Sequence, residues 1–417
     1  MAQLSDDCFA HGGPLMRVAA ALELLAERTQ AVTAPETRPL AACLDRVLAE
    51  PLVAPFDVPP HDNSAVDGYA VFFEDLNAES ETRLPIGARV AAGHALDRPG
   101  KRGEAIRIFT GAAMPEGPDT VMMQEDCREE DGSVVIAPGI KQGSNRRKRG
   151  EDFKTGDLLV PQGRRLRPQD LGQAAACGLT ELSVYGPLRV ALFSTGDELR
   201  QPGEPLEAGA IYDSNRAVLS GLLTGLGCAV TDLGILRDKA KGIEAALAEA
   251  AAAHDLVITS GGVSVGEEDH VKQAVETLGN LHVWRLAIKP GRPIALGQIA
   301  RVPFVGLPGN PVAVMVTFLT IVRPLILRLM GAEMLPARRF LVRSDFTHKK
   351  KAERREWVRA SLVALPDGGF AAQKFSRQGA GILSSLVESD GLVELPEDMT
   401  LLEPGALVDF LPFSEVL

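Results

Sequence analysis

The sequence predicts a multidomain α/β plus β protein, on the basis of three observations. Between about residues 186 and 331, apolar strands alternate with helical segments, which is typical of an α/β domain with a largely parallel sheet. Two further regions, 55–143 and 332–417, consist of short apolar runs separated by Gly, Pro and Asp turns, which indicates small β domains. Helical segments lie on both sides of the first β region. We therefore expect a helical linker domain split over residues 14–54 and 144–185, with the β domain inserted in it.

In the linker domain, Pro14 is expected to open an amphipathic helix. A second helix is expected over residues 40–48, ended by Pro51. A third should run from Pro168 to about residue 177, where Gly178 stops it. The strands expected in the inserted β domain are 69–73, 105–109, 120–123 and 134–137.

In the α/β domain the alternation between apolar strands and helices is regular. The expected strands are 189–193, 229–236, 256–259, 282–288, 294–297 and 303–307, and the expected helices are 215–226, 240–253, 270–278 and 312–330. In the C-terminal region the expected strands are 340–343, 357–363, 392–395 and 407–411.

Composition and charge exclude several classes of protein. The net charge is −11, from 44 basic and 55 acidic residues, whereas a general nucleic-acid binder would show a basic excess. The 5 cysteines are far apart and form no Cys-x-x-Cys pair, which argues against a disulfide framework and a cysteine-based zinc site. The N-terminus has no apolar core of a signal peptide, and no stretch reaches the roughly 18 uninterrupted apolar residues of a membrane span. We expect a soluble, cytoplasmic protein with no nucleic-acid partner and no membrane association.

Three strand ends of the α/β domain carry polar loops, and ligands of open α/β sheets bind at such ends. The loops cover residues 194–198, 260–269 and 307–311. In the second, adjacent glycines let backbone N–H groups converge, Ser264 adds a hydroxyl and a helix follows, so the loop is suited to hold an anion. No Gly-Lys-Ser/Thr closes it, so it is not a Walker P-loop. The alternative is an ordinary tight turn between strand and helix.

Three acidic residues, Glu198, Asp238 and Asp269, each follow the end of an expected strand. Carboxylates gathered beside phosphates usually hold Mg²⁺, a hard cation that prefers oxygen ligands. The alternative is that each caps a helix or accepts hydrogen bonds from its own loop.

Lys289 and Arg292 flank a Pro-Gly turn that leaves the expected strand 282–288. Two cations on so restricted a turn suit an oxyanion such as phosphate or molybdate, and arginine offers a planar two-point contact. The alternative is that both are solvated on the surface. In the first half of the chain, polar runs at 62–70, 107–112 and 147–152 stand out, but physical reasoning leaves open whether they meet the α/β loops.

Together these motifs resemble the MoeA family, which is similar to the E domain of gephyrin and of its plant counterpart. The matching segments are 62–70, 107–112, 147–152, 194–199, 260–269, 288–293 and 306–312. They follow the family's order over most of the chain. The resemblance implies an elongated homodimer with a split helical linker domain, an inserted β domain, a molybdopterin-binding α/β domain and a C-terminal β-barrel.

The resemblance also implies an activity: insertion of molybdate into adenylylated molybdopterin with Mg²⁺, yielding molybdenum cofactor and AMP. In the family, the β domain and the α/β domain that form one cleft come from different subunits. The residues carried over by motif are Asp67, Thr110 and Asp152 in the cleft, Glu198, Asp238 and Asp269 as the acidic, metal-binding cluster, Ser264, Lys289 and Arg292 as oxyanion contacts, Pro308 and Pro311 in the pterin loop, and Arg147 and Arg354 as further cofactor-binding residues.

The chain departs from the family pattern at two positions. Arg292 stands where many members have Lys, and Ala380 where members often have Ser, so a paralogue that prefers tungstate is an open possibility. Two different functions also stay open: an adenylyltransferase that makes the adenylylated pterin, and a non-enzymatic binding or scaffold protein. Candidate partners are a molybdopterin adenylyltransferase and molybdoenzyme apoproteins or their chaperones.

Overall fold

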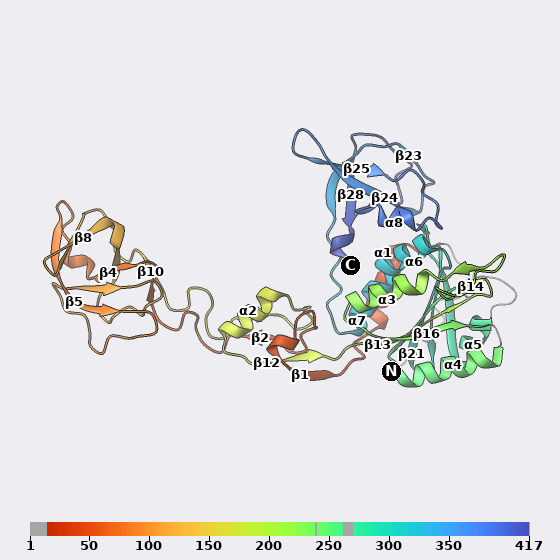
Figure 1. Ribbon diagram of the computed structural model, residues 1–417, viewed down its shortest axis with the longest axis horizontal. Coiled ribbons are helices and arrows are strands. Elements are labelled where there is room, and N and C mark those ends of the chain that lie inside the picture. The colour runs from red at the N-terminus through yellow and green to blue at the C-terminus, as the bar shows by residue number, and fades with distance from the viewer. Residues whose placement is uncertain (1–14, 238–239, 262–269, 417) are drawn as a thin grey trace.

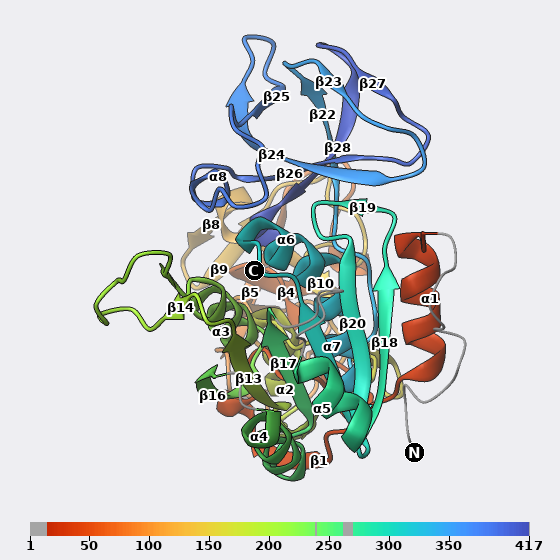
Figure 2. The same cartoon turned by 90° about the vertical axis from the view of Figure 1, so that its right-hand side faces the viewer.

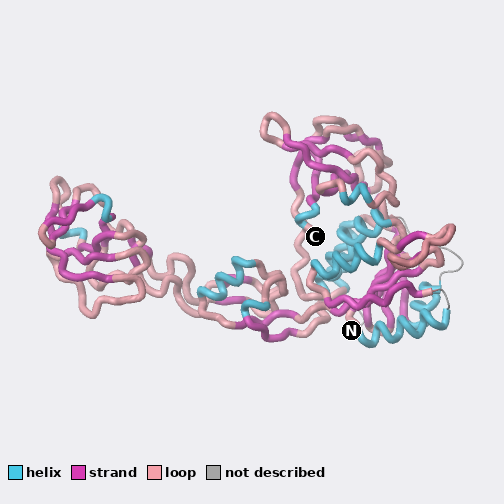
Figure 3. Tube along the Cα trace, in the orientation of Figure 1, coloured by secondary structure: helices cyan, strands magenta, loops and turns pink. Residues whose placement is uncertain are grey.

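The computed structural model describes residues 15–237, 240–261 and 270–416. The chain is elongated: the inserted β domain lies at one end, the linker domain follows, and the α/β and C-terminal domains lie together at the other end (Figure 1). Helices are concentrated in the α/β domain, and the other parts are mostly strands and loops (Figure 3). The predicted multidomain architecture is confirmed.

The inserted β domain has a six-stranded sheet in the order β7-β4-β6-β5-β9-β8. Its strands are β4 (Gly68–Val71), β5 (Thr82–Val90), β6 (Ala105–Ile108), β7 (Thr120–Met123), β8 (Cys127–Glu130) and β9 (Ser133–Ile136). All four expected strands are present. The long strand β5 was not expected, because Pro85 and Gly87 lie inside it and both residues usually argue against a strand interior.

The linker domain is built on two antiparallel strand pairs and the helix α2 (Pro168–Ala176). The pairs are β1 (Pro35–Pro39) with β12 (Glu181–Tyr185), and β2 (Leu52–Val53) with β11 (Leu158–Val160); a further pair, β3 (Asn63–Ser64) with β10 (Arg146–Arg147), leads to the β domain. The helix expected over residues 40–48 is wrong. Only a 3₁₀ turn, Leu40–Ala42, forms, because Asp45 has a left-handed φ of 62° and Val47 and Leu48 form β-bridges instead.

The first helix, α1 (Val18–Arg28), begins later than the expected start at Pro14. Before it, Met16 forms a parallel β-bridge with Leu286 of the α/β domain. The buried face of α1 joins the core of that domain rather than the core of the linker. Within the span 14–54 assigned to the linker, this helix therefore packs on the α/β domain.

The α/β domain contains a six-stranded sheet in the order β16-β13-β17-β21-β20-β18 (Figure 2). Its strands are β13 (Arg189–Thr195), β16 (Ala229–Leu236), β17 (Leu256–Ser260), β18 (Gly279–Arg285), β20 (Pro293–Ile299) and β21 (Val302–Leu307). The pairings among β16, β13, β17 and β21 are parallel, and those that add β20 and β18 are antiparallel. The parallel strands put their carboxyl ends at one edge, where the predicted loops 194–198 and 307–311 lie and the loop 260–269 begins.

Helices cover both faces of this sheet, and each face has its own hydrophobic core. The helices are α3 (Asn215–Gly225), α4 (Ala240–Ala253), α5 (His270–Leu278), α6 (Pro311–Thr317) and α7 (Arg323–Leu329); a short parallel pair, β14 (Leu199–Arg200) with β15 (Ile211–Tyr212), projects beside α3. A π-helical turn, Phe318–Val322, joins α6 to α7. The resulting helix Pro311–Leu329 is long and apolar enough to cross a membrane by length and composition, but 83% of its most apolar window is buried inside the protein. This burial makes it a core helix of the α/β domain.

The C-terminal domain is a closed barrel in which β24, β25, β22, β28 and β26 follow one another and β26 pairs back with β24. The elements are β22 (Phe340–Ser344), β23 (His348–Lys349), β24 (Arg355–Ala364), β25 (Phe370–Lys374), α8 (Ser384–Val387), β26 (Gly391–Leu395), β27 (Leu401–Leu402) and β28 (Leu407–Pro412). The predicted β-barrel is confirmed, with β25 as a strand that was not expected.

One strand of the α/β domain joins the sheet of the barrel. This is β19 (Ile288–Lys289), which pairs in parallel with β24 so that Ile288 lies opposite Arg355 and Lys289 opposite Glu356. Backbone pairing thus connects the two domains beside the edge where the parallel strands end.

Candidate functional site

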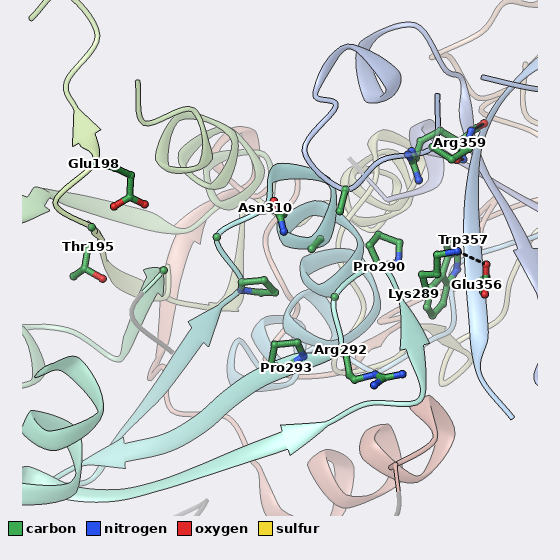
Figure 4. A pocket seen from close by; sticks show the side chains of 18 of the residues that line it. Thr195, Glu198, Lys289, Pro290, Arg292, Pro293, Asn310, Glu356, Trp357 and Arg359 are labelled. Carbon is green, nitrogen blue, oxygen red and sulfur yellow. Dashed lines mark hydrogen bonds and ion pairs between the residues drawn. The ribbon is translucent and has the colours of Figure 1, made fainter. Parts of the chain in front are cut away.

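A cavity of about 800 Å³ lies between the α/β domain and the barrel. The ends of β13, β17 and β21 form one side of it, with Thr195, Glu198 and Asn310 among the lining residues. The turn after β19 and the strand β24 form the other side, with Lys289, Glu356 and Arg359 (Figure 4). The cavity therefore occupies the place where open α/β sheets bind ligands.

Two of the strand-end loops are held together by Asn215, the first residue of α3. Its side-chain nitrogen donates hydrogen bonds to Ser260 Oγ at 2.9 Å and to the carbonyl oxygen of Gly309 at 2.7 Å. Pro308, next to Gly309 in the same loop, lines the cavity, and Pro311 is the first residue of α6. Sequence reasoning missed Asn215, because its partners are far away in the sequence.

Both predicted oxyanion contacts of the Pro-Gly turn, Lys289 and Arg292, line the cavity. The side chain of Lys289 is 52% exposed, and its Nζ lies 3.3 Å from Glu356 Oε2. Arg292 is exposed and also borders a smaller groove that contains Arg354. The turn therefore presents two cations to the cavity, and one of them already has a carboxylate partner.

Glu356 is a buried carboxylate that sequence reasoning did not identify. Its Oε2 accepts from Lys289 and from Nε2 of His348 at 3.2 Å, and its Oε1 accepts from Arg354 at 2.6 Å. Burial acts to raise the pKa of Glu356, but the hydrogen bond from His348 and the charges of Lys289 and Arg354 outweigh it and lower the pKa below its ordinary value. Glu356 is therefore ionised at neutral pH, and Arg354 is held by it rather than lining the cavity.

Arg359 is a second lining residue that was not predicted. It is only 2% exposed, its Nε donates to Ser385 Oγ and its terminal nitrogen donates to the carbonyl oxygen of Gly379, each at 3.1 Å. Within the described ranges no carboxylate pairs with it, and burial lowers its pKa to about 10. A buried guanidinium without a counter-charge is costly unless an anion joins it, so Arg359 marks where an anionic ligand fits.

The acidic cluster is only partly described. Glu198 lines the cavity and is exposed, whereas Asp238, Asp269 and the predicted oxyanion contact Ser264 lie outside the described residues. Among residues 15–237, 240–261 and 270–416, no group of three or more His, Cys, Asp or Glu side chains is arranged to hold a metal ion. One oxygen donor suited to Mg²⁺ is thus in place, and the metal site stays a prediction.

The remaining predicted residues lie away from this cavity. Asp67 Oδ1 accepts hydrogen bonds from the backbone N–H of Thr110 at 2.8 Å and from its hydroxyl at 2.7 Å, and these bonds lower the pKa of Asp67. Arg147 is exposed on β10, and Asp152 lines a separate hollow of about 500 Å³ in the linker domain. These elements lie toward the opposite end of the molecule from the cavity (Figure 1). One chain therefore does not bring the two sets of predicted residues together.

The fold and the cavity define a class: a multidomain α/β protein with a cavity lined by cationic side chains where its parallel strands meet a C-terminal barrel. Three family descriptions match the chain, "MoeA N-terminal region (domain I and II)" over residues 16–178, "Probable molybdopterin binding domain" over 191–328 and "MoeA C-terminal region (domain IV)" over 342–413.

Relatives agree over nearly the whole length. The molybdopterin molybdenumtransferase of Haemophilus influenzae is 39% identical over 91% of this chain and 94% of its own, and that of a Nostoc species is 37% identical over 88% and 86%. The solved structure of the molybdopterin biosynthesis MoeA protein from Pyrococcus horikoshii superposes with a TM-score of 0.81 at 29% identity, covering 96% of this chain and all of that one (100%). The chain belongs to the MoeA family. The predicted family, and with it the class of transferases in molybdenum cofactor biosynthesis, is confirmed.

Proposed function

We propose that this protein inserts molybdate into adenylylated molybdopterin with release of AMP, the last step of molybdenum cofactor biosynthesis. The observation that carries the proposal is the buried guanidinium of Arg359, which pairs with no carboxylate of the described residues, at the wall of a cavity that the strand-end loops also line. Membership of a family whose curated members are named molybdopterin molybdenumtransferase supports the choice of substrates.

The lining residues suit the parts of these substrates. Molybdate is a compact dianion, and Arg359, Lys289 and Arg292 offer it positive charge and N–H donors in a partly enclosed site. The strand-end loops held by Asn215 suit the phosphate groups and the pterin. The cavity of about 800 Å³ is within the usual size range for a ligand of this class.

Mg²⁺ is part of the proposal. Glu198 supplies one oxygen at the cavity, and Asp238 and Asp269 are the further ligands we propose. When bound, Mg²⁺ neutralises charge on the phosphates whose bond is broken as AMP leaves.

A homodimer is also part of the proposal. The inserted β domain, to which Asp67 and Thr110 belong, lies at the far end of the molecule from the α/β and C-terminal domains (Figure 1), so a second copy is needed to bring such residues to the cavity. A closed two-fold dimer is the commonest arrangement that does this. We propose that the protein acts in the cytoplasm, between a molybdopterin adenylyltransferase and the molybdoenzyme apoproteins or their chaperones.

The experiment is incubation of the purified protein with adenylylated molybdopterin, Mg²⁺ and either molybdate or tungstate, with AMP release followed over time. We expect molybdate-dependent AMP release. No AMP with either oxyanion would overturn the proposal and favour a non-catalytic binding protein, and a faster reaction with tungstate would replace molybdate as the substrate.

A further inference from the structure

Two donors share one carboxylate oxygen at the cavity wall. Lys289 Nζ and His348 Nε2 both lie against Glu356 Oε2, at 3.3 and 3.2 Å, while Arg354 occupies Oε1. Lys289 and Glu356 are direct neighbours in the β19–β24 pairing, so strand register fixes this contact. A carboxylate oxygen can accept two hydrogen bonds, so Oε2 keeps one donor when the other leaves.

The two donors differ in their freedom to leave. Both residues line the cavity, but the side chain of Lys289 is 52% exposed and that of His348 only 13%. A lysine has a long flexible stem, so its ammonium can turn from Glu356 toward an anion in the cavity. If no second donor were present, that movement would leave a buried carboxylate oxygen unpaired, which is expensive. His348 removes most of this cost.

We propose that Lys289 pairs with Glu356 while the cavity is empty and moves to the oxyanion when it binds. His348 then remains as the hydrogen-bond donor to Glu356 Oε2. The inference rests on the proposed function, because it assigns the oxyanion to this cavity. It makes His348 a positioning residue, which acts on the oxyanion through Glu356 and Lys289.

The exchange has a consequence for protonation. In the resting state burial lowers the pKa of His348, whereas the hydrogen bond and the charge of Glu356 raise it. The positive charges of Lys374 on β25 and Lys289 on β19 lower it further. The strand paired with His348, β27, contributes only Leu401 and Leu402. When Lys289 turns toward a dianion, one neighbouring positive charge is compensated and the pKa of His348 rises. Molybdate binding should then take up a proton. The affinity for molybdate should increase as the pH falls through the interval between the pKa of His348 in the bound protein and its pKa in the free protein.

Calorimetric titration of the full-length protein with molybdate alone tests this at pH 6.5, in two buffers of different ionisation enthalpy. We expect a net uptake of protons on binding. His348→Gln keeps a donor without a titrating ring, so it should lose the proton uptake while its affinity stays within about threefold. His348→Leu removes the donor as well, and should lose the uptake and about three- to tenfold in affinity.

His254→Gln is the matched control. Like His348, His254 is hydrogen-bonded, in this case to a hydroxyl and a carbonyl oxygen, but it lies at the end of α4, away from the cavity. It should behave like the parent. Binding without proton uptake, or uptake that persists in His348→Gln, overturns the inference and leaves the oxyanion site standing. Absence of any molybdate binding in the parent, under conditions where thermal unfolding shows folded protein, overturns the oxyanion site itself.

Discussion

The two ends of this molecule carry different parts of one predicted site. At the cavity, cations dominate the wall formed by the turn and the barrel: Lys289, Arg292 and the buried Arg359. In the β domain, by contrast, the hydrogen-bonded pair of Asp67 and Thr110 lies at the surface. The comparison teaches that the chain has a cavity with a cationic wall at one end, and the groups proposed to complete the site at the other.

The largest effect is expected from complementation between subunits. Asp67→Ala and Asp269→Ala should each be nearly inactive in AMP release, because each removes a group from every cleft. Mixing them should restore about a quarter of parent activity: half of the dimers are then mixed, and each has one intact cleft. Asp269→Ala mixed with Glu198→Ala is the control, because both changes fall in the same half of the cleft and should not complement. Failure to complement despite demonstrated subunit exchange would mean that the β domain does not reach a partner's cavity.

Arg359→Met should separate binding from stability. Loss of a charged donor to the oxyanion costs about 1.5–3 kcal/mol, so the molybdate concentration for half-maximal AMP release should rise roughly 10- to 100-fold. The variant no longer buries an unpaired charge, which offsets its two lost hydrogen bonds, so the free energy of unfolding should change by less than about 1 kcal/mol. Denaturant titration and activity are measured on the same sample. Normal molybdate use in this variant would show that Arg359 has only a structural role.

A smaller effect is expected at the turn. Lys289→Ala should raise the molybdate requirement about tenfold, because one fixed charge worth ~1.4 kcal/mol is lost. Arg292→Lys should be milder, since charge is kept and only the planar contact is lost. Binding of molybdopterin, measured in parallel, should weaken less than molybdate use in both variants. If both variants use molybdate like the parent, the turn is scaffold alone.

The fold was predictable where local pattern and final environment agree. The strand β17 is fully buried and β13 is buried after its first residue, Arg189, and both are mostly apolar in sequence, so their pattern is unambiguous. The helix predicted over residues 40–48 does not form, because Asp45 has a left-handed conformation that the surrounding sequence does not indicate. Likewise, α1 has an ordinary amphipathic pattern, which reveals a buried face but not that its partner is the distant α7.

The site was predictable where chemistry lies in short motifs. Lys289, Arg292, Glu198 and Pro308 all reach the cavity because they directly follow or border strand ends. Glu356, His348 and Arg359 were missed, because their roles depend on the pairing of β19 with β24, between residues 67 positions apart. An arginine between the apolar residues Trp357, Val358 and Ala360 was the available signal for Arg359.

The smallest expected effect concerns Ala380, which lines the cavity where family members often have serine. Its carbonyl oxygen accepts the backbone N–H of Val312 at 3.0 Å, which holds this loop against the start of α6. Ala380→Ser would therefore add a hydroxyl beside the anion site without moving the backbone. One hydrogen bond to the oxyanion is worth about 0.5–1 kcal/mol, so molybdate affinity should improve roughly two- to fivefold, and the ratio of molybdate to tungstate affinity should be compared in both proteins. The same change in an Arg359→Met background completes a double-mutant cycle. If the hydroxyl and the guanidinium contact one oxyanion, the two effects are not additive. Additive effects would place position 380 and Arg359 at separate ligands.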